Sequence, residues 1–452
     1  MDKEFHGWFW PFFVTLTLQN LIVIGVNLSD NVMLGAYAES ALAGAAAVNQ
    51  IQVLMQMIIN GAVDGAVVLS SQYWGQGRVK PIKHVGAAAF YTALAVSAVF
   101  FALVSLFPRQ SVSVFTSDAA IVEAGLSYLK YIRLTYPLIA VTAALLAIMR
   151  SVETVKIALV VSAGSFFLNI FFNYCLIYGN FGAPELGPAG AALATLICRV
   201  MELVAVVCYV AFWEKKLRIG LRELFTPQKE LALDYFKVSA PLIVIGLQYG
   251  LNLAVHTVIL GHINSSAIAA NSIAGNLVAM LKIVAGASAT AAGVIIGKTV
   301  GRGDIPKVKQ YTRLLQRIFI CIGLCSCAVI LLLRGPILSL YNVTEETRAL
   351  AWDFLLILSL TNIGTAYQMP AATGIVRGGG DTKFVMVNDL ISIWCILIPF
   401  SALAAFVFRW PATAVVICLY SDQVFKCLPV AIKVNRYNWM KNLTRGSAVR
   451  LD

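Results

Sequence analysis

Long apolar runs alternate with short polar clusters along the whole chain. Between clusters of polar, Gly and Pro residues the apolar runs reach about 20 residues or more, which is the length that crosses the hydrocarbon core of a bilayer as a helix. The pattern predicts twelve membrane-spanning helices, near residues 10–36, 44–73, 85–107, 120–148, 157–178, 188–212, 238–261, 267–297, 314–333, 349–376, 384–408 and 411–432.

Composition agrees with an all-α membrane protein. Of the 452 residues 59% are hydrophobic and only 12% are charged, and the mean hydropathy is +0.80. Soluble domains carry about 25% charged residues. We therefore expect a multi-pass protein of the cell (inner or plasma) membrane. We do not expect an enzyme, because no nucleophile, metalloprotease or phosphate-loop motif occurs and the inner loops are too short for a catalytic domain.

The distribution of Lys and Arg predicts the orientation of the chain. Most of the 34 Lys and Arg residues fall in the tail and in the loops on the side of the termini, whereas the opposite loops hold only Arg109, Arg334, Arg348 and Arg409. Cytoplasmic loops collect positive charge, so both termini should be cytoplasmic. The net charge of +12 then reflects topology and attraction to anionic lipid, and we expect no nucleic-acid partner.

The sequence repeats itself at half its length. A shift of 226 residues, half of 452, aligns "VMLGAYAESALAG" with "VILGHINSSAIAA" and, without a gap, "YWGQGRVKPIKH" with "TVGRGDIPKVKQ". We predict an N-terminal lobe of spans 1–6 (residues 1–212), a cytoplasmic linker (213–237) and a C-terminal lobe of spans 7–12 (238–452). Six spans per half give both copies the same orientation, so a pseudo-two-fold axis should run along the membrane normal, with a solute path between the bundles.

Six short stretches together carry a family resemblance. They are "SDNVMLG", "GQGR", "GRGD", "NYCLIYG", "LGPAGAALAT" and "VRGGGDTKF", and in this order and spacing the chain resembles the multidrug and toxic compound extrusion (MATE) family over nearly its whole length. The resemblance implies a secondary antiporter that exports amphipathic organic solutes or drugs in exchange for H⁺ or Na⁺ by alternating access. We expect a monomer whose partners are a small-molecule substrate and membrane lipids, with no cofactor beyond the coupling ion. A lipid-linked oligosaccharide flippase remains the alternative, and it would line its cavity with several arginines.

Asp30 is a carboxylate near the outer end of the first span, where an ionised group must be paired, protonated or in contact with water. Asn169 and Asn173 lie four residues apart on one face of the fifth span, and Thr195 lies near the same end of the sixth. The resemblance implies a cation-coupling site of these four residues. We expect Asp30 to be its only charge. Several relatives carry a second acid where this chain has Asn173, which favours H⁺ over Na⁺, although Na⁺ at Asp30 and a purely structural aspartate stay open.

The second half offers further polar candidates. His256 is the counterpart of Asp30 at the 226-residue shift, and Lys282 lies near the middle of the eighth span. We take these two, with Tyr367 and Gln368 of the tenth span, as candidates for coupling or substrate contact. The stretch "TNIGTAYQMPAATGIV" of the tenth span contains no acid before Arg377, so a second carboxylate cation site is not expected there.

Charged residues at helical spacing predict local ion pairs. Arg199 with Glu202 and Asp422 with Lys426 are three and four residues apart. Asp64 and Tyr37 are candidate cavity residues of the first half. For Lys282 an interhelical pair with Asp389 or Asp64 competes with a role in substrate binding, and if Lys282 faces the cavity, a strictly cationic substrate is disfavoured.

Overall fold

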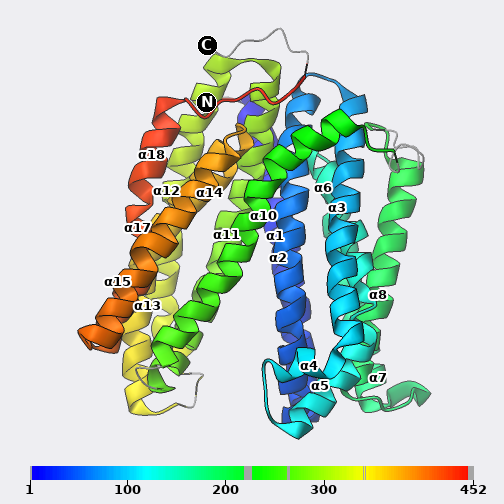
Figure 1. Cartoon of the computed structure of the whole chain (residues 1–452), viewed down its shortest axis with the longest axis vertical. Helices are drawn as coiled ribbons and strands as arrows, with labels where there is room; N and C mark the ends of the chain where they lie inside the picture. The colour runs from blue at the N-terminus through cyan, green and yellow to red at the C-terminus, as the bar shows by residue number, and fades with distance from the viewer. Residues whose placement is uncertain (1–2, 218–225, 262–264, 340, 342, 446–452) are drawn as a thin grey trace. The chain divides into compact units, whose positions relative to one another are not determined.

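The computed structural model describes residues 3–217, 226–261, 265–339, 341 and 343–445, and the regular structure in this part of the chain is helical. The all-α prediction is therefore confirmed. The principal helices are α1 (Lys3–Tyr37), α2 (Glu39–Gly75), α3 (Val79–Leu106), α4 (Pro108–Ser113), α5 (Ala119–Ile132), α6 (Thr135–Ser151), α7 (Lys156–Tyr178), α8 (Pro188–Cys208), α10 (Lys229–Gly261), α11 (Ser265–Arg302), α12 (Ile305–Leu338), α13 (Glu345–Pro370), α14 (Thr382–Leu390), α15 (Ile398–Ala402), α16 (Ala412–Tyr420), α17 (Asp422–Phe425) and α18 (Cys427–Arg436) (Figure 1).

These helices supply the twelve predicted spans. Among the described residues, 10 helical segments are long and apolar enough to cross a membrane, and the bent pair α5–α6 forms one more. Helix α10, 33 residues long, covers the remaining predicted span, 238–261, but is not among these apolar segments. The last two spans each join several elements. The eleventh runs from α14 through α15 with π-helical turns at η4 (Ile391–Leu397) and η5 (Leu403–Val407), and the twelfth runs through α16, α17 and α18.

The fourth predicted span, 120–148, is broken and not continuous. Helices α5 and α6 meet at an angle of 50° around Arg133 and Leu134. Pro137 explains the break, because proline has no N–H to donate to the carbonyl four residues earlier and its ring crowds that carbonyl. The carbonyl of Arg133, four residues before Pro137, accepts instead from the amide of Tyr136 at 3.2 Å.

Large apolar side chains remain exposed along the long helices. Val99 on α3, Phe167 on α7 and Leu332 on α12 are 64%, 70% and 76% exposed. Soluble monomers rarely expose so many large apolar side chains, because contact of apolar surface with water is unfavourable. In a membrane the lipid tails cover such side chains and keep them away from water. The exposed apolar residues therefore mark lipid-facing helix faces.

The chain divides into two compact units. Unit 2 comprises residues 14–70 and 77–246, and unit 1 comprises residues 1–13, 71–76 and 247–452. Helices α1, α2 and α10 each contribute residues to both units. Helix α10 begins at Lys229, inside the range predicted as a linker, while residues 218–225 of that range lie outside the described residues.

In unit 2, α7 packs against α8, α5 against α8, and α3 against α6. Gly190 in the first turn of α8 lets that helix approach the last turn of α7, since a Cβ on Gly190 would collide with the carbonyl of Leu176. Gly187, with φ of 53°, forms the turn into α8. This close contact brings the polar residues of "NIFFNYCLIYG" next to the start of the sixth span.

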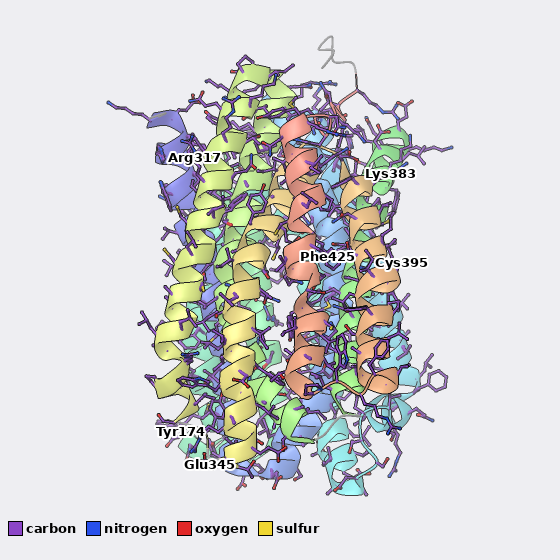
Figure 2. The ribbon with its side chains drawn as sticks, turned by 90° about the vertical axis from the view of Figure 1, so that its left-hand side faces the viewer. Tyr174, Arg317, Glu345, Lys383, Cys395 and Phe425 are labelled. Carbon is purple, nitrogen blue, oxygen red and sulfur yellow. The ribbon has the colours of Figure 1, made fainter. Side chains whose placement is uncertain are left out.

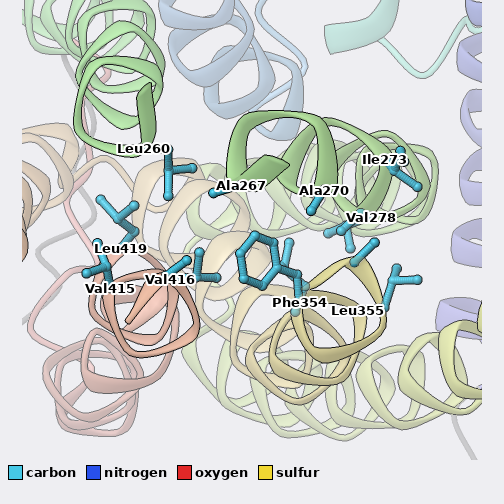
Figure 3. Close-up of a cluster of buried hydrophobic side chains, with 14 of the residues drawn as sticks. Leu260, Ala267, Ala270, Ile273, Val278, Phe354, Leu355, Val415, Val416 and Leu419 are labelled. Atoms are coloured by element: carbon cyan, nitrogen blue, oxygen red, sulfur yellow. The ribbon is translucent and has the colours of Figure 1, made fainter. Parts of the chain in front are cut away.

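In unit 1, α11 packs against α13 and α12, and its apolar core lies where α10, α11, α13 and α16 meet. Phe354 of α13 projects into this core between Ala270 of α11 and Val416 of α16 (Figure 3). Within the unit Arg317 and Lys383 lie toward one end of the helices and Glu345 lies at the opposite end (Figure 2). Arg317 and Lys383 belong to segments that the sequence predicts to be cytoplasmic, and Glu345 belongs to a loop predicted on the opposite side.

The residues after α18 form a strap, residues 437–445, over one end of unit 1. Trp439 is fully buried, and its indole donates to the carbonyl of Val434 at 2.9 Å. Gln72, in the last turns of α2, donates to the carbonyl of Lys441 at 3.1 Å and accepts from the amide of Leu443 at 2.8 Å. The strap therefore ties the end of α2 to the second half of the chain.

Candidate functional site

Asp30 lies on α1 in unit 2, partly buried against α7. The side-chain amide of Asn173 donates a hydrogen bond to Asp30 Oδ1 at 2.5 Å. The hydroxyl of Tyr178, one turn and a half further along α7, donates to the carbonyl of Met33 at 2.8 Å. These two bonds join α1 to α7 at the depth expected from span counting.

Asn169 and Asn173 form a buried amide ladder on α7. They are 1% and 0% exposed, and Asn173 Nδ2 also donates to Asn169 Oδ1 at 3.1 Å. Asn169 Nδ2 and Asn173 Oδ1 are buried with no hydrogen-bond partner among the described residues. The ladder thus keeps one donor and one acceptor beside the carboxylate, so it can bond either protonation state of Asp30.

Asp30 is the only charged residue among the four predicted ones, but a charged pair on α8 acts on it from outside this cluster. Arg199 and Glu202 on α8 form the predicted local pair, with Nη1 and Oε2 2.7 Å apart. Arg199 also interacts electrostatically with Asp30. The sequence predicts the pair from its spacing, but its proximity to Asp30 depends on the packing of α8 against α7.

Thr195, the fourth predicted member, is on α8 but bonds within its own helix. Its hydroxyl donates to the carbonyl of Ala191 at 3.0 Å, and among the described residues it makes no hydrogen bond to Asp30, Asn169 or Asn173. The structure therefore brings together Asp30, Asn169 and Asn173 by direct hydrogen bonds. Thr195 is linked to them only by the packing of its helix, α8, against α7.

The other first-half candidates lie elsewhere in unit 2. Asp64 of α2 pairs with Arg150 of α6, with Oδ1 and Nη1 3.7 Å apart and both side chains about a quarter exposed. Tyr37, at the end of α1, packs its ring near Tyr178 with 6.3 Å between centroids.

In unit 1, His256 and Gln368 lie near one polar network, whereas Tyr367 lies in another. The ring of His256 meets Tyr420 edge-on at 5.6 Å. Gln368 Nε2 donates to Gln423 Oε1 at 3.2 Å, and Gln423 Nε2 donates to Asp422 Oδ2 at 2.8 Å. Tyr367 instead donates its hydroxyl to Gln316 of α12 at 2.8 Å.

A buried three-residue ion network in unit 1 includes one residue that sequence reasoning misplaced. Lys426 Nζ lies 3.0 Å from Asp422 Oδ2, which is the predicted pair, and also 3.0 Å from Asp389 Oδ1. The alternative pairing of Asp389 with Lys282 is therefore wrong. The four-residue spacing within one helix predicts the pair of Asp422 and Lys426. Asp389 lies on another span, so residue spacing along the sequence does not predict its contact with Lys426.

Oxygen and nitrogen ligands for a metal are sparse. Among the described residues no group of three or more His, Cys, Asp or Glu side chains is placed to hold a metal ion. At the Asp30 cluster the available donors are one carboxylate and two amide groups, a set suited to a proton or, more weakly, to an alkali cation.

Among the described residues 10 long apolar helical segments and one bent pair, two compact units and a partly buried carboxylate bonded to an amide inside one of them define a class: polytopic helical membrane transporters. The MatE family model matches residues 16–175 and again residues 237–403, once in each half of the chain. The chain belongs to the MatE family, as its motifs predicted, and the second match agrees with the internal repeat.

Curated relatives are similar over most of their length. "Uncharacterized transporter YisQ" of Bacillus subtilis is 25% identical over 405 residues, which cover 87% of this chain and 85% of that protein. "Probable multidrug resistance protein NorM" of Listeria innocua is 24% identical over 398 residues, covering 86% of each chain.

Solved structures confirm the fold. The eukaryotic MATE transporter AtDTX14 has a TM-score of 0.85 at 16% identity, with 97% of each chain covered. The MATE transporter VcmN of Vibrio cholerae, in its bent form, has a TM-score of 0.84 at 15% identity, with 96% of this chain and 97% of that one covered. The comparisons do not favour the flippase alternative.

Proposed function

We propose that this MATE-family transporter is a secondary antiporter that exports amphipathic organic solutes in exchange for H⁺ by alternating access. Its place would be the plasma membrane, with both termini cytoplasmic. The similarity to probable multidrug resistance proteins supports export of organic compounds, and the bias of Lys and Arg toward one side supports the orientation.

The observation that carries the proposal is the Asp30–Asn173–Asn169 cluster. Ionised Asp30 accepts from Asn173 Nδ2, and the unpartnered Asn173 Oδ1 can accept from a protonated Asp30 after the amide rotates. Taking up a proton removes the charge on α1 and reverses the direction of its hydrogen bond to α7. Such a change biases a two-state element, which is what alternating access requires.

Exchange further requires that binding of a proton and binding of substrate weaken each other. If a bound proton lowers substrate affinity, then by thermodynamic reciprocity a bound substrate lowers proton affinity by the same factor. Asp30 would then be loaded from outside and would release its proton to the cytoplasm as substrate binds.

Na⁺ is the second candidate for the coupling ion, and the surroundings of Asp30 favour H⁺. The cluster has a single carboxylate, and the charge of Arg199 acts on it. Arg199 would repel a bound Na⁺, whereas a proton adds to Asp30 itself and needs no shell of oxygen ligands. The local pair of Arg199 with Glu202 at 2.7 Å reduces this repulsion without removing the positive charge.

The test is ion-driven efflux from proteoliposomes that carry either a pH gradient or a Na⁺ gradient. Asp30→Asn mimics the protonated form and retains an amide that fits the hydrogen-bonding site, so it should keep its folded yield and lose efflux driven by the pH gradient by at least about tenfold. Asp353→Asn is the matched control, because it makes the same change at an exposed acid on α13.

Each result decides one part of the proposal. Full efflux from Asp30→Asn would end the role of Asp30. Wild-type efflux that requires Na⁺ and ignores the pH gradient would keep the site and replace H⁺ by Na⁺.

A further inference from the structure

Three polar side chains form a stripe on the part of α10 that belongs to unit 1. Gln248, Asn252 and His256 are spaced by four residues, so they lie on one face of the helix. Gln248 and His256 are 5% and 9% exposed. Gln248 Oε1, Asn252 Oδ1 and His256 Nε2 are all buried without a hydrogen-bond partner among the described residues. Buried polar groups in proteins are almost always bonded, so such a row indicates a place where a ligand supplies the bonds.

Lys282 of α11 brings a positive charge to the same region. It interacts electrostatically with His256 and with Asp422. No carboxylate among the described residues lies within 4.0 Å of its ammonium, because Asp422 and Asp389 both bond to Lys426 at 3.0 Å. An ammonium inside a membrane protein needs a counter-ion or water, and here the nearest acids already share another lysine.

The three helices involved meet at this point. His256 of α10 packs its ring edge-on against Tyr420 of α16, and the Tyr420 hydroxyl donates to Asn271 of α11 at 3.1 Å. The apolar core of unit 1 continues along the same three helices. Polar stripe, cation and aromatic ring therefore belong to one region inside one unit.

The first half of the chain has no equivalent of this arrangement. At the 226-residue shift, Gln248, Asn252 and Lys282 correspond to Ile22, Val26 and Gln56. The duplicated scaffold thus carries a cation and a polar stripe in one half only, apart from the cluster of Asp30.

We propose that Lys282, His256 and the polar stripe of α10 form a substrate subsite for an oxyanion, the carboxylate of an amphipathic solute, so that the exported compounds include organic anions and zwitterions. The inference rests on the proposed export function and specifies its substrate class. Lys282 supplies the charge. The amides of Gln248 and Asn252 donate to the oxyanion after rotating by half a turn, so that their N–H groups take the places of the unpartnered oxygens, and His256 donates from Nε2 in the tautomer that carries the proton there. A purely cationic solute would meet the unneutralised charge of Lys282.

The test is equilibrium binding of three fluorescent probes to purified protein in detergent. The probes share one scaffold: a coumarin-3-carboxylate, its neutral amide, and an amide that carries a quaternary ammonium. Wild type should bind the carboxylate at least about tenfold more tightly than the amide, which corresponds to one good hydrogen-bonded charge. Lys282→Met should remove this preference and leave amide binding unchanged, and Lys282→Arg should retain it.

Lys130→Met is the matched control, because Lys130 is an exposed lysine on α5 whose ammonium lies over the ring of Tyr131. It should bind all three probes as wild type does. Equal wild-type affinity for carboxylate and amide would overturn the proposal, whether or not the Lys282 variants fold. So would an unchanged preference in Lys282→Met, or an equal loss of all three probes, which would show a structural role.

Binding in detergent needs no ion gradient, so the two proposals fail separately. Asp30→Asn with intact proton-driven efflux would overturn the coupling role while carboxylate binding still stands. Wild-type protein that shows no preference for the carboxylate but exports the ammonium probe in a proton-dependent way would overturn the subsite alone.

Discussion

Asp30 and His256 occupy equivalent positions in the two halves of the chain, yet their surroundings differ in kind. Asp30 accepts a hydrogen bond from Asn173, whereas His256 contacts an aromatic ring and leaves Nε2 without a partner among the described residues. A carboxylate surrounded by amides holds or releases one proton. An imidazole next to an uncompensated ammonium is suited to contact a negatively charged ligand.

The bond from Asn173 to Asp30 should be measurable as a coupling free energy. A double-mutant cycle of Asp30→Leu and Asn173→Leu should give about 1–3 kcal/mol, because one partner is a carboxylate. Neutral side-chain pairs between membrane helices average roughly 0.6 kcal/mol. Unfolding of the purified variants by denaturant in micelles gives the four free energies.

The same cycle with Asp30→Leu and Thr195→Val provides the comparison. Thr195 bonds to the carbonyl of Ala191 and has no hydrogen bond to Asp30, so its coupling should be below about 0.5 kcal/mol, as for residues without a shared contact. Equal couplings in both cycles would contradict the arrangement described for Asn173.

At the scale of elements, the strap of residues 437–445 and the start of α14 form a charged joint in unit 1. Asp381 caps α14 by accepting from the amide of Phe384 at 3.4 Å. Its carboxylate also lies 2.8 Å from both Lys433 of α18 and Lys441 of the strap. One nearly buried acid therefore connects a helix start, a helix end and the strap.

This joint should make stability depend on pH. Burial alone would raise the pKa of Asp381, but the hydrogen bonds and charges of Lys433 and Lys441 outweigh it and hold the pKa below its ordinary value. A lowered folded-state pKa stabilises the protein above the unfolded pKa of about 4 and loses this contribution as pH falls through the folded value. Asp381→Asn should therefore destabilise by about 1.5–3 kcal/mol at pH 5–8, and the deficit should shrink below about pH 4.

Asp304→Asn is the control for this effect. Asp304 caps α12 in the same way, but its carboxylate is 4.0 Å from Lys307 and both side chains are more than a third exposed. Asp304→Asn should lower the free energy of unfolding by less than about 1 kcal/mol, as for exposed ion pairs. Thermal unfolding in detergent from pH 3.5 to 8 makes the comparison, and equal, pH-independent deficits for the two variants would refute it.

At the scale of the whole molecule, the family model matches each half, so one scaffold occurs twice in the chain. The scaffold is shared, but the polar residues it carries are not. The first half places its carboxylate with amides on α7, and the second half places an ion network on Lys426 beside Lys282. The two proposals accordingly assign ion coupling to the first half and substrate contact to the second half of one duplicated scaffold.

Topology is the whole-molecule prediction. Green fluorescent protein fused after Asp452 should fluoresce, because it folds in the cytoplasm, and alkaline phosphatase fused there should be inactive. Phosphatase inserted after Arg109 or Arg409 should be active, since both lie in loops expected outside. The opposite pattern at all three positions would invert the proposed direction of transport, and a mixed pattern would contradict the span count.

Local spacing was sufficient for those features that a single helix determines. Apolar run lengths predicted the twelve spans, the 226-residue shift predicted the duplication, and the intervals of three and four residues predicted the pairs Arg199–Glu202 and Asp422–Lys426. Such pairs follow from helix geometry alone, because residues three or four apart always share a face. Span counting also placed Asp30 at the depth of Asn173, since each residue advances about 1.5 Å along a helix.

Only the tertiary structure decided which residues of different helices meet. Depth along a span does not specify which way a helix face points, and rotation and tilt depend on packing against neighbours. That is why Asp389 contacts Lys426 and not Lys282, why Asp64 contacts Arg150, and why Arg199 acts on Asp30. The unpartnered stripe on α10 is of the same kind: its spacing is visible in the sequence, but its burial beside an uncompensated Lys282 is a property of the folded helices.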